Sequence, residues 1–385
     1  AAGWRVTGVD ISESRLARLS ENLARTGLEA ELVIRPLARG QDEALVPATS
    51  NTALVAPPLM RATADARADI LSMVYGLNSR PIDNLWLNAR FRYFDYDNKT
   101  PHFEATQLVG DWSVGANLWE TEPLSVRNQS LDLDASFTPV NYLAFGVGYG
   151  RQDDKRTFRI FEDTAENIFR VSVDSTGNAY FTARLKYERS NREGSGFDPH
   201  VLEEVAEQPD MRHYDVANRD RSRVTALVTL TPTPWLNVNG SVATGDDDYD
   251  DTGFGLRDNT NRAYGVGFDL MPLDTVNMGV SYQREKYTSF QYSRSSNPGV
   301  TFTDPRRDWS LDSDDRVNTV TAYVDLLKAL PKTDIRLSYD LSDGKVTYVY
   351  GLTPEGAAIL FPTTPLQQLA PVENRLIDAR LDAMY

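Results

Sequence analysis

The sequence predicts an all-β protein: part of an antiparallel transmembrane β-barrel of about 12–14 strands, with a short β-α-β segment at its N-terminus. Three observations predict this class. Apolar residues occupy every second position over much of the chain after residue 65, the period of a strand with one apolar face. These strands come in pairs joined by short proline-containing turns, and long polar stretches separate the pairs. No run of 18 or more apolar residues, enough for a membrane-spanning helix, occurs.

Composition restricts the function. The 385 residues include 40 basic and 55 acidic side chains, a net charge of −15 that argues against nucleic-acid binding, which needs a basic surface. Cysteine is absent, which excludes disulfides, thiolate metal sites, a cysteine nucleophile and covalent CxxCH haem attachment in this chain. Aromatic residues make up 10% of the chain, which fits a strand-rich protein.

Residues 1–38 have the pattern of a single β-α-β unit. WRVTGVDI and AELVIR read as short buried strands on either side of a helix over Arg15–Arg25, with Ser12 as its N-cap and Gly27 after its end. Such a unit is too short to fold alone. We expect residues 39–64 to be a linker. The first residues lack the pattern of a signal peptide, so either the protein stays inside the cell or its natural N-terminus lies upstream.

The region 65–385 contains one motif four times: a strand, a short turn with proline, and a return strand. The first strands are SLDLDASFTP, RVTALVTLTP, RAYGVGFDLMP and VTAYVDLLKALP. The return strands are LAFGVGY, WLNVNGSV, VNMGVSY and DIRLSY. The turn prolines are Pro139, Pro232, Pro272 and Pro331. The repetition indicates a meander of β-hairpins.

Between the hairpins, we expect long, polar and acidic connections, parts of which extend the strands outward as ribbons. They cover residues 150–178, 188–222, 244–261, 284–315 and 342–374. Alternation of short and long connections is typical of an antiparallel barrel that crosses a bilayer.

A soluble β-sandwich also has alternating strands, and periodicity alone leaves it open. Two features favour the barrel. The prolines stay on one side of the meander, and full charges stand inside the strands opposite the apolar face. We expect the following charged residues to face a wet lumen or a partner within it: Asp132, Asp134, Arg184, Lys186, Arg219, Arg221, Asp269 and Arg336. The aromatics expected in the interfacial girdle are Tyr149, Tyr187, Trp235, Tyr282 and Tyr287.

The acidic stretch GDDDYDD is the only candidate cation site, and a weak one. Asp246, Asp248 and Asp250 offer the carboxylate oxygens that calcium prefers, yet the spacing lacks an EF-hand pattern, so a solvated loop is the simpler interpretation. The three histidines lie far apart and read as surface residues.

No Ser-His-Asp arrangement, metal-ligand spacing or phosphate-binding loop stands out, so we expect no enzyme activity and no cofactor held by this chain. Residues 212–223, RHYDVANRDRSR, carry a mixture of arginine and aspartate. They read either as a charged network at the rim or lumen, or as a salt-bridged loop that contributes little stability.

Several phrases resemble the MtrB/PioB family of outer-membrane β-barrels over about residues 60–385. They are LNARFRYFDYDNKTP, VDSTGNAYFTARLKYERSNREGSGFD, RHYDVANRDR, YQREKYTSFQYSR and FTDPRRDWSLDSDDRV. The resemblance implies a porin-like barrel in the bacterial outer membrane that sheathes a periplasmic multihaem c-type cytochrome, which carries the haem. An extracellular cytochrome is a further candidate partner. Family members usually have more strands, and this sequence stops in mid-strand, so we expect the barrel to be incomplete at the C-terminus. A general porin or solute channel is the alternative.

The N-terminal segment resembles another family. GWRVTGVDISESRLARLSENLARTGLEAELV is similar to the middle of a Rossmann-type S-adenosylmethionine-dependent methyltransferase that modifies ribosomal RNA cytosines. Asp10 matches the acidic residue that binds the cofactor's ribose. The glycine-rich turn and the catalytic cysteines of that family are missing, so we expect a vestigial site without activity. A join between two unrelated reading frames would explain the pairing of the two resemblances.

Overall fold

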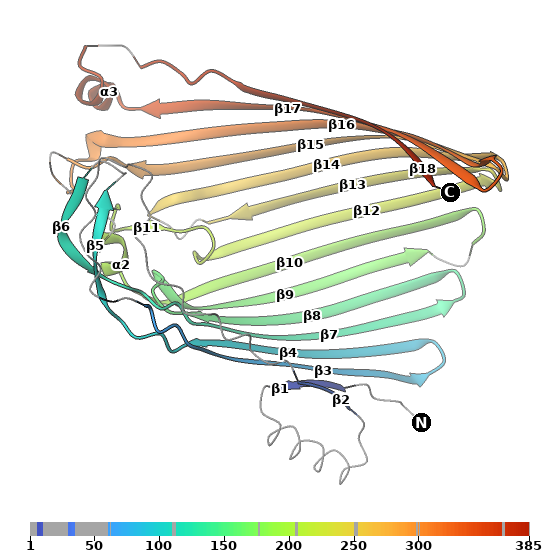
Figure 1. Ribbon diagram of the computed structural model, residues 1–385, viewed down its shortest axis with the longest axis horizontal. Coiled ribbons are helices and arrows are strands. Elements are labelled where there is room, and N and C mark those ends of the chain that lie inside the picture. Colours follow the sequence, from blue (N-terminus) through green and yellow to red (C-terminus); the bar gives the residue numbers. More distant parts are fainter. Residues whose placement is uncertain are drawn as a thin grey trace, which may run out of the picture.

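A computed structural model describes residues 6–10, 30–34, 61, 63–109, 113–175, 178–204, 207–249, 253–297, 299, 301–363 and 366–384. They form a 16-stranded sheet in the order β18-β17-β16-β15-β14-β13-β12-β10-β9-β8-β7-β4-β3-β1-β2, with β11 beside β14 and a separate β5-β6 hairpin. Figure 1 shows long strands lying side by side as a curved antiparallel sheet. Apart from the short β1, β2 and β11, the strands agree with the predicted 12–14.

The long strands of the sheet are β3 (Ala68–Ile82), β4 (Leu85–Asn98), β7 (Val126–Val140), β8 (Leu143–Arg156), β9 (Phe161–Ser175), β10 (Phe181–Phe197), β12 (Arg219–Thr233), β13 (Leu236–Asp248), β14 (Phe254–Leu273), β15 (Val276–Arg294), β16 (Asp308–Leu330), β17 (Thr333–Leu352) and β18 (Val372–Met384). The shorter elements are β1 (Val6–Asp10), β2 (Ala30–Ile34), β5 (Glu104–Val109), β6 (Ser113–Glu120), β11 (Met211–Arg212), α2 (His200–Glu204), the 3₁₀ helix η1 (Pro305–Arg307) and α3 (Pro354–Leu360). No helix among the described residues is long and apolar enough to span a membrane.

The four predicted hairpins are confirmed as β7-β8, β12-β13, β14-β15 and β16-β17. Pro139, Pro232 and Pro272 lie where the strand register shifts just before the turn, as does Pro81 in β3-β4. Proline cannot donate to the backbone ladder, so a local irregularity next to the turn is where a sheet tolerates it. The β9-β10 turn lacks proline, and the proline signal therefore missed that hairpin.

The predicted long connections are largely strand, which corrects their expected bounds. β8 continues to Arg156, β10 to Phe197 and β15 to Arg294, and the true connections at this end are residues 99–125, 157–160, 198–218, 249–253, 295–307 and 353–371. Cross-strand ion pairs and hydrogen bonds let polar segments continue the ladder beyond the apolar part. Figure 1 shows the short turns at one end of the sheet and these connections at the other.

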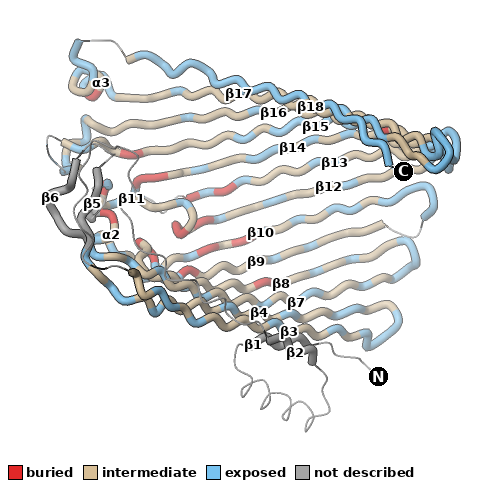
Figure 2. Tube along the Cα trace, in the orientation of Figure 1, coloured by how far each residue is buried: buried red, intermediate tan, exposed pale blue. Residues whose placement is uncertain are grey.

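One face of the sheet is apolar and accessible. Alternate residues of each long strand form an apolar belt, with Val147 and Phe169 both 59% exposed. The register sets these side chains next to one another: Val147 opposes Val171, which opposes Tyr187, and further along Val266 opposes Tyr282. Figure 2 shows how few residues of the sheet are buried. An exposed belt of this extent requires an apolar solvent.

Tyrosines mark the edge of the belt toward the long connections. Tyr149, Tyr187 and Tyr282 lie there on the apolar face, as predicted, and the Tyr149 hydroxyl donates to Asn167 Oδ1 at 2.8 Å. Trp235 lies at the opposite margin, in a short turn. The prediction for Tyr287 was wrong: it lies five positions after Tyr282, and an odd step along a strand places it on the polar face.

The belt has the height of an outer membrane. On β14 it runs from Tyr264 to Leu273. At about 3.3 Å per residue and a tilt of about 40°, this segment spans roughly 23 Å, close to the ~25 Å apolar band of outer-membrane barrels.

At the N-terminus, β1 and β2 pair in parallel, as the predicted β-α-β unit requires, and the predicted helix lies outside the described residues. β1 also pairs antiparallel with β3, which the sequence did not predict. The division into a methyltransferase-like segment and a linker over residues 39–64 stays a prediction.

We predict that lysine on the apolar face destabilises the protein far more than lysine on the polar face. Val266→Lys, in the belt, should cost about 2–4 kcal/mol of unfolding free energy in lipid. Gln283→Lys, on the polar face of the neighbouring strand, should cost less than about 1 kcal/mol. Urea titration of the protein refolded in vesicles measures both, and equal costs would contradict the assignment of the two faces.

Candidate functional site

The polar face, opposite the belt, carries every charged residue predicted to face the lumen. Strand alternation places all eight there: Asp132 and Asp134 on β7, Arg184 and Lys186 on β10, Arg219 and Arg221 on β12, Asp269 on β14 and Arg336 on β17. Six of them belong to three groups with partners on nearby strands, and Arg184 and Lys186 lie beside the first group.

The first group lies across β7, β8 and β9. Arg170 on β9 reaches over β8 to β7, where its Nη2 lies 2.8 Å from Asp132 Oδ1 and 3.7 Å from Asp134 Oδ1. It passes over Gly148 and Gly150: a Cβ at Gly148 would lie 3.1 Å from Arg170 Nε, and one at Gly150 3.3 Å from its Nη2. Glycine on the intervening strand therefore permits an ion pair between two strands that are not neighbours.

Beside this group lies a hollow of about 470 Å³ lined by residues of β3, β4, β7, β8, β9 and β10. Arg184 and Lys186 are at its margin, paired with Asp174 and Glu188. The Arg184 side chain is still 60% exposed, so it remains available to solvent or a partner.

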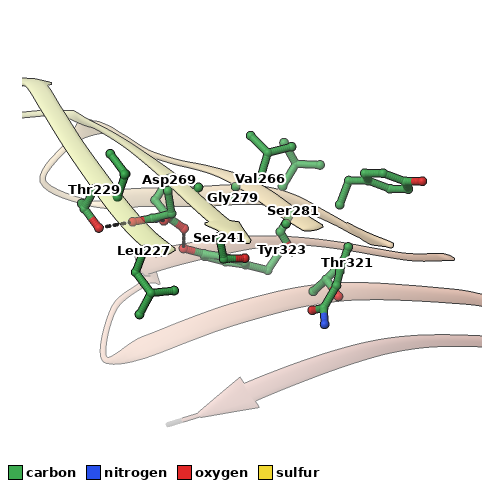
Figure 3. A pocket seen from close by; sticks show the side chains of 17 residues that line it. Leu227, Thr229, Ser241, Val266, Asp269, Gly279, Ser281, Thr321 and Tyr323 are labelled. Atoms are coloured by element: carbon green, nitrogen blue, oxygen red, sulfur yellow. Dashed lines mark hydrogen bonds between the residues drawn. The ribbon is translucent and has the colours of Figure 1, made fainter. Parts of the chain in front are cut away.

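The second group is a hydrogen-bonded chain from β12 to β16, shown in Figure 3. Thr229 donates to Asn239, Asn239 donates to Asp269 Oδ2 at 2.9 Å, and the Tyr323 hydroxyl donates to Asp269 Oδ1 at 2.8 Å. Tyr323 crosses β15 at Gly279, where a Cβ would overlap its ring. These residues line a hollow of about 380 Å³. Arg336 stacks over the Tyr323 ring at 5.3 Å and lies 3.6 Å from Asp325.

The third group lies beyond the belt, toward the long connections. Arg219 reaches over β10, and its Nη2 lies 2.8 Å from Glu166 Oε1. The Arg221 guanidinium donates hydrogen bonds from two nitrogens to the buried Asp247 carboxylate. Arg192 donates to the carbonyls of Tyr214, Asp215 and Ala217 and so fixes the connection 198–218 against the polar face. β11, within that connection, pairs with β14, so the chain passes over the ends of β12 and β13.

A small apolar core supports this connection. Leu202 of α2 and Val216 are fully buried against Ile160 and Phe161, and Arg212 stacks on Phe197 at 3.6 Å. Of the two interpretations of residues 212–223, the contacts favour a charged network at the rim, because Arg219 and Arg221 lie on β12 and bind acceptors on two other strands, β9 and β13.

Electrostatics stabilise the ionised form of Asp247, which lies beyond the belt. Burial alone would raise the pKa of this carboxyl, but the hydrogen bond from Arg221 and the nearby Arg219 and Arg223 outweigh it, so its pKa lies below the ordinary value. Burial lowers the pKa of Arg192, and Arg219 adds repulsion.

The calcium candidates do not converge. Asp246 is exposed and accepts a hydrogen bond from Thr260, Asp248 lies opposite Asp258, and Asp250 is outside the described residues. Within the described part of the chain, no three acidic or histidine side chains are placed to hold a metal. Asp10 ends β1, as predicted, and the structure does not describe its side chain.

Sequence reasoning missed Arg170, Glu166, Arg192 and Tyr323, the partners that complete the three groups. A signal was present for Arg170: it shares the alternation of Ser172 and Asp174, opposite a strand with glycine at every second residue, GVGYG. Contacts that skip a strand leave no period in the sequence, so the others were not predictable.

A strand meander with a lipid-facing belt, tyrosine margins and a polar opposite face defines a bacterial outer-membrane β-barrel protein. The chain belongs to the MtrB/PioB family: the family model described as outer membrane beta-barrel porin, MtrB/PioB, matches residues 37–385. The protein is therefore a porin-like protein of the bacterial outer membrane.

The chain is 26% identical over 320 residues to outer membrane protein MtrB of Shewanella baltica (strain OS185), covering 81% of this chain and 44% of that protein. It thus spans less than half the length of this curated relative. Among solved structures, the ferric enterobactin receptor PfeA of Pseudomonas aeruginosa, with enterobactin, matches with TM-score 0.31 and 9% identity over 76% of this chain and 72% of that one. OccD3 of Pseudomonas aeruginosa matches with TM-score 0.27 and 7% identity over 83% and 87%.

We predict that a methyl group at Gly279 disrupts the second group. Gly279→Ala places a carbon against the Tyr323 ring and Asp269, so it should cost about 1–3 kcal/mol of unfolding free energy and break their hydrogen bond. Gly240→Ala is the matched control, since nothing lies within 4 Å of its added Cβ. Urea titration in lipid measures both, and a neutral Gly279→Ala would show that the Tyr323 crossing contributes nothing.

The Arg221–Asp247 pair should give the protein a defined acid sensitivity. Because the folded pKa of Asp247 is lowered, its stabilisation is complete above the ordinary carboxyl pKa of 3.8 and disappears as pH falls through the lower folded value. Asp247→Asn should therefore cost about 2 kcal/mol at neutral pH.

This difference from wild type should shrink only below about pH 4. Urea midpoints measured at a series of pH values test this, with Asp83→Asn in an exposed turn as control. A difference that is constant down to pH 2 would refute the role of the Asp247 charge.

Proposed function

We propose that this chain forms part of a barrel wall that sheathes a periplasmic multihaem c-type cytochrome, so that electrons cross the outer membrane inside the barrel. Membership of the MtrB/PioB family supports the proposal. The chain has no cysteine, so it cannot attach a c-type haem itself, and in this proposal the haem belongs to the partner.

The observation that carries the proposal is the chemistry of the polar face. Its charges are mostly matched across strands, as Arg170 is with Asp132 and Arg219 with Glu166. Such a wall is wettable and offers paired polar groups to a protein inside it. Exposed cations such as Arg184 are left to contact acidic groups of the partner.

The same wall would also suit a solute channel, which is the second candidate. The connection 198–218, fixed over the polar face by Arg192, favours it, because an inward connection narrows the path of a solute. Neither function requires catalysis by this chain. Among the described residues, the polar groups are paired with one another rather than arranged as nucleophile, base and oxyanion donors.

We expect the intact outer-membrane protein that contains this chain to co-purify from detergent extracts with a haem-staining protein. Arg184→Gln combined with Arg336→Gln removes two exposed polar-face cations and should lower the recovered haem per barrel several-fold. Arg189→Gln, beyond the belt on the opposite face, should not change it. Recovery of the intact barrel with no haem-bearing companion, together with solute flux through it in liposomes, would instead establish the channel.

A further inference from the structure

A row of cations runs along the apolar side of the sheet, just beyond the belt. In the strand register, Arg262 on β14 lies opposite Lys286 on β15, Lys286 lies opposite Arg316 on β16, and Arg316 lies opposite Lys345 on β17. Arg284 is diagonal to this row, opposite Tyr264. Like charges directly opposite one another destabilise a sheet, so the row calls for a counter-charge.

The row lies at the height of lipid headgroups. Arg262 comes two residues beyond Tyr264 on the same face, and Arg284 two residues beyond Tyr282. The Tyr282 hydroxyl donates to Asn318 Oδ1 at 2.8 Å, and Asn318 is the cross-strand partner of Arg284. Tyrosine hydroxyls at the edge of an apolar belt mark the boundary between acyl chains and polar headgroups.

The protein supplies too little negative charge to neutralise this row. Asp314 bonds both Lys286, at 3.0 Å, and Arg316, at 2.7 Å, and Glu373 bonds Lys345 at 2.7 Å. Arg262 and Arg284 are exposed, and neither forms an ion pair within the part of the chain that the structure describes.

The row is local. At the same height on β12 and β13, the corresponding positions are Ser222, Thr244 and Asp246, and the chain as a whole has a net charge of −15. Arg189 on β10 and Arg151 on β8 also lie two residues beyond a margin tyrosine, but each is a single cation, and Arg151 pairs with Asp153. An excess of positive charge on four adjacent strands of so acidic a protein is not a general property of its surface. Figure 1 shows β14, β15, β16 and β17 side by side.

We propose that Arg262, Arg284, Lys286, Arg316 and Lys345 form a binding surface for the phosphate groups of lipids in the surrounding leaflet. Arginine binds phosphate through paired N–H donors, and basic clusters next to a membrane recruit anionic headgroups. Bacterial barrels place short turns in the periplasm and longer connections outside, so the row faces the outer leaflet and phosphorylated glycolipid is its ligand. The inference rests on the outer-membrane location and not on the proposed function.

The test uses the intact protein in vesicles of phosphatidylcholine with a small fraction of lipid A, either phosphorylated or dephosphorylated. After detergent extraction, native mass spectrometry counts the lipid A molecules that remain bound. Arg262→Gln combined with Arg284→Gln removes two charges and leaves every described ion pair of the row intact, so the fold should not change. Arg90→Gln combined with Arg92→Gln, on the polar face of β4, is the control that removes the same charge away from the lipid-facing side.

We expect wild type and the control to retain phosphorylated lipid A at least about tenfold more than the Arg262/Arg284 variant, and none of the three to retain the dephosphorylated form. Inorganic phosphate at millimolar concentration should not displace the lipid, because it lacks the acyl chains that pack on Tyr264 and Tyr282. Equal retention by wild type and the Arg262/Arg284 variant would overturn the proposal, and so would equal retention of the two lipid forms. Heat-modified gel mobility verifies that each variant is folded.

Discussion

The backbone ladder from β3 to β18 decides which solvent each side chain meets, because successive residues of a strand point to opposite faces. Its register aligns apolar residues with apolar residues over many strands, as in the row Val147, Val171 and Tyr187, and aligns charges with charges on the other face. A slip of one residue would bring Arg170 into lipid and Val171 into water. Since unpaired backbone groups are costly in hydrocarbon, the strands cannot separate to relieve such an error. The belt and the charged groups are therefore two results of one register.

Glycine gives the polar face contacts that a ladder of neighbouring strands would not provide. Gly148 and Gly150 let Arg170 cross β8, and Gly279 lets Tyr323 cross β15. Each crossing contact connects three strands on the polar face, where no lipid packs against them. The same absence of side chains leaves hollows in the wall, which widen the space next to it. Glycine in a strand is unfavourable for the isolated backbone, and these crossing contacts offset that cost.

Alternation of residues predicted much of this architecture. Period-2 patterns and turn prolines sufficed for four hairpins, for the two faces and for the placement of Asp132 or Arg336, because each depends on residues close in sequence. They did not suffice for partners. Glu166 and Arg219 are 53 residues apart and are brought together only by strand order, which the sequence alone leaves open. Polar segments such as residues 150–156 were predicted to be connections because both of their faces are wet and they lack an apolar period. They are strands, and cross-strand ion pairs such as Lys155–Asp163 connect them to their neighbours.

The strands are longer than is needed to cross a membrane. The part of the sheet within the belt and the part beyond it are therefore stabilised in different ways. A tilted strand of about 9–11 residues crosses the apolar layer, whereas β16 has 23 residues and β14 has 20. Within the belt, lipid covers one face, and the pairing of apolar residues set by the register stabilises that face. Beyond it, water meets both faces, and the ladder is held by ion pairs such as Arg221–Asp247 and by the connection 198–218 that Arg192 fixes against the sheet. On the lipid-facing side, charge is thus free to vary from strand to strand only in this outer part. Any distinction between neighbouring surfaces of the wall, whether for lipid or for protein, therefore has to be made there or on the polar face.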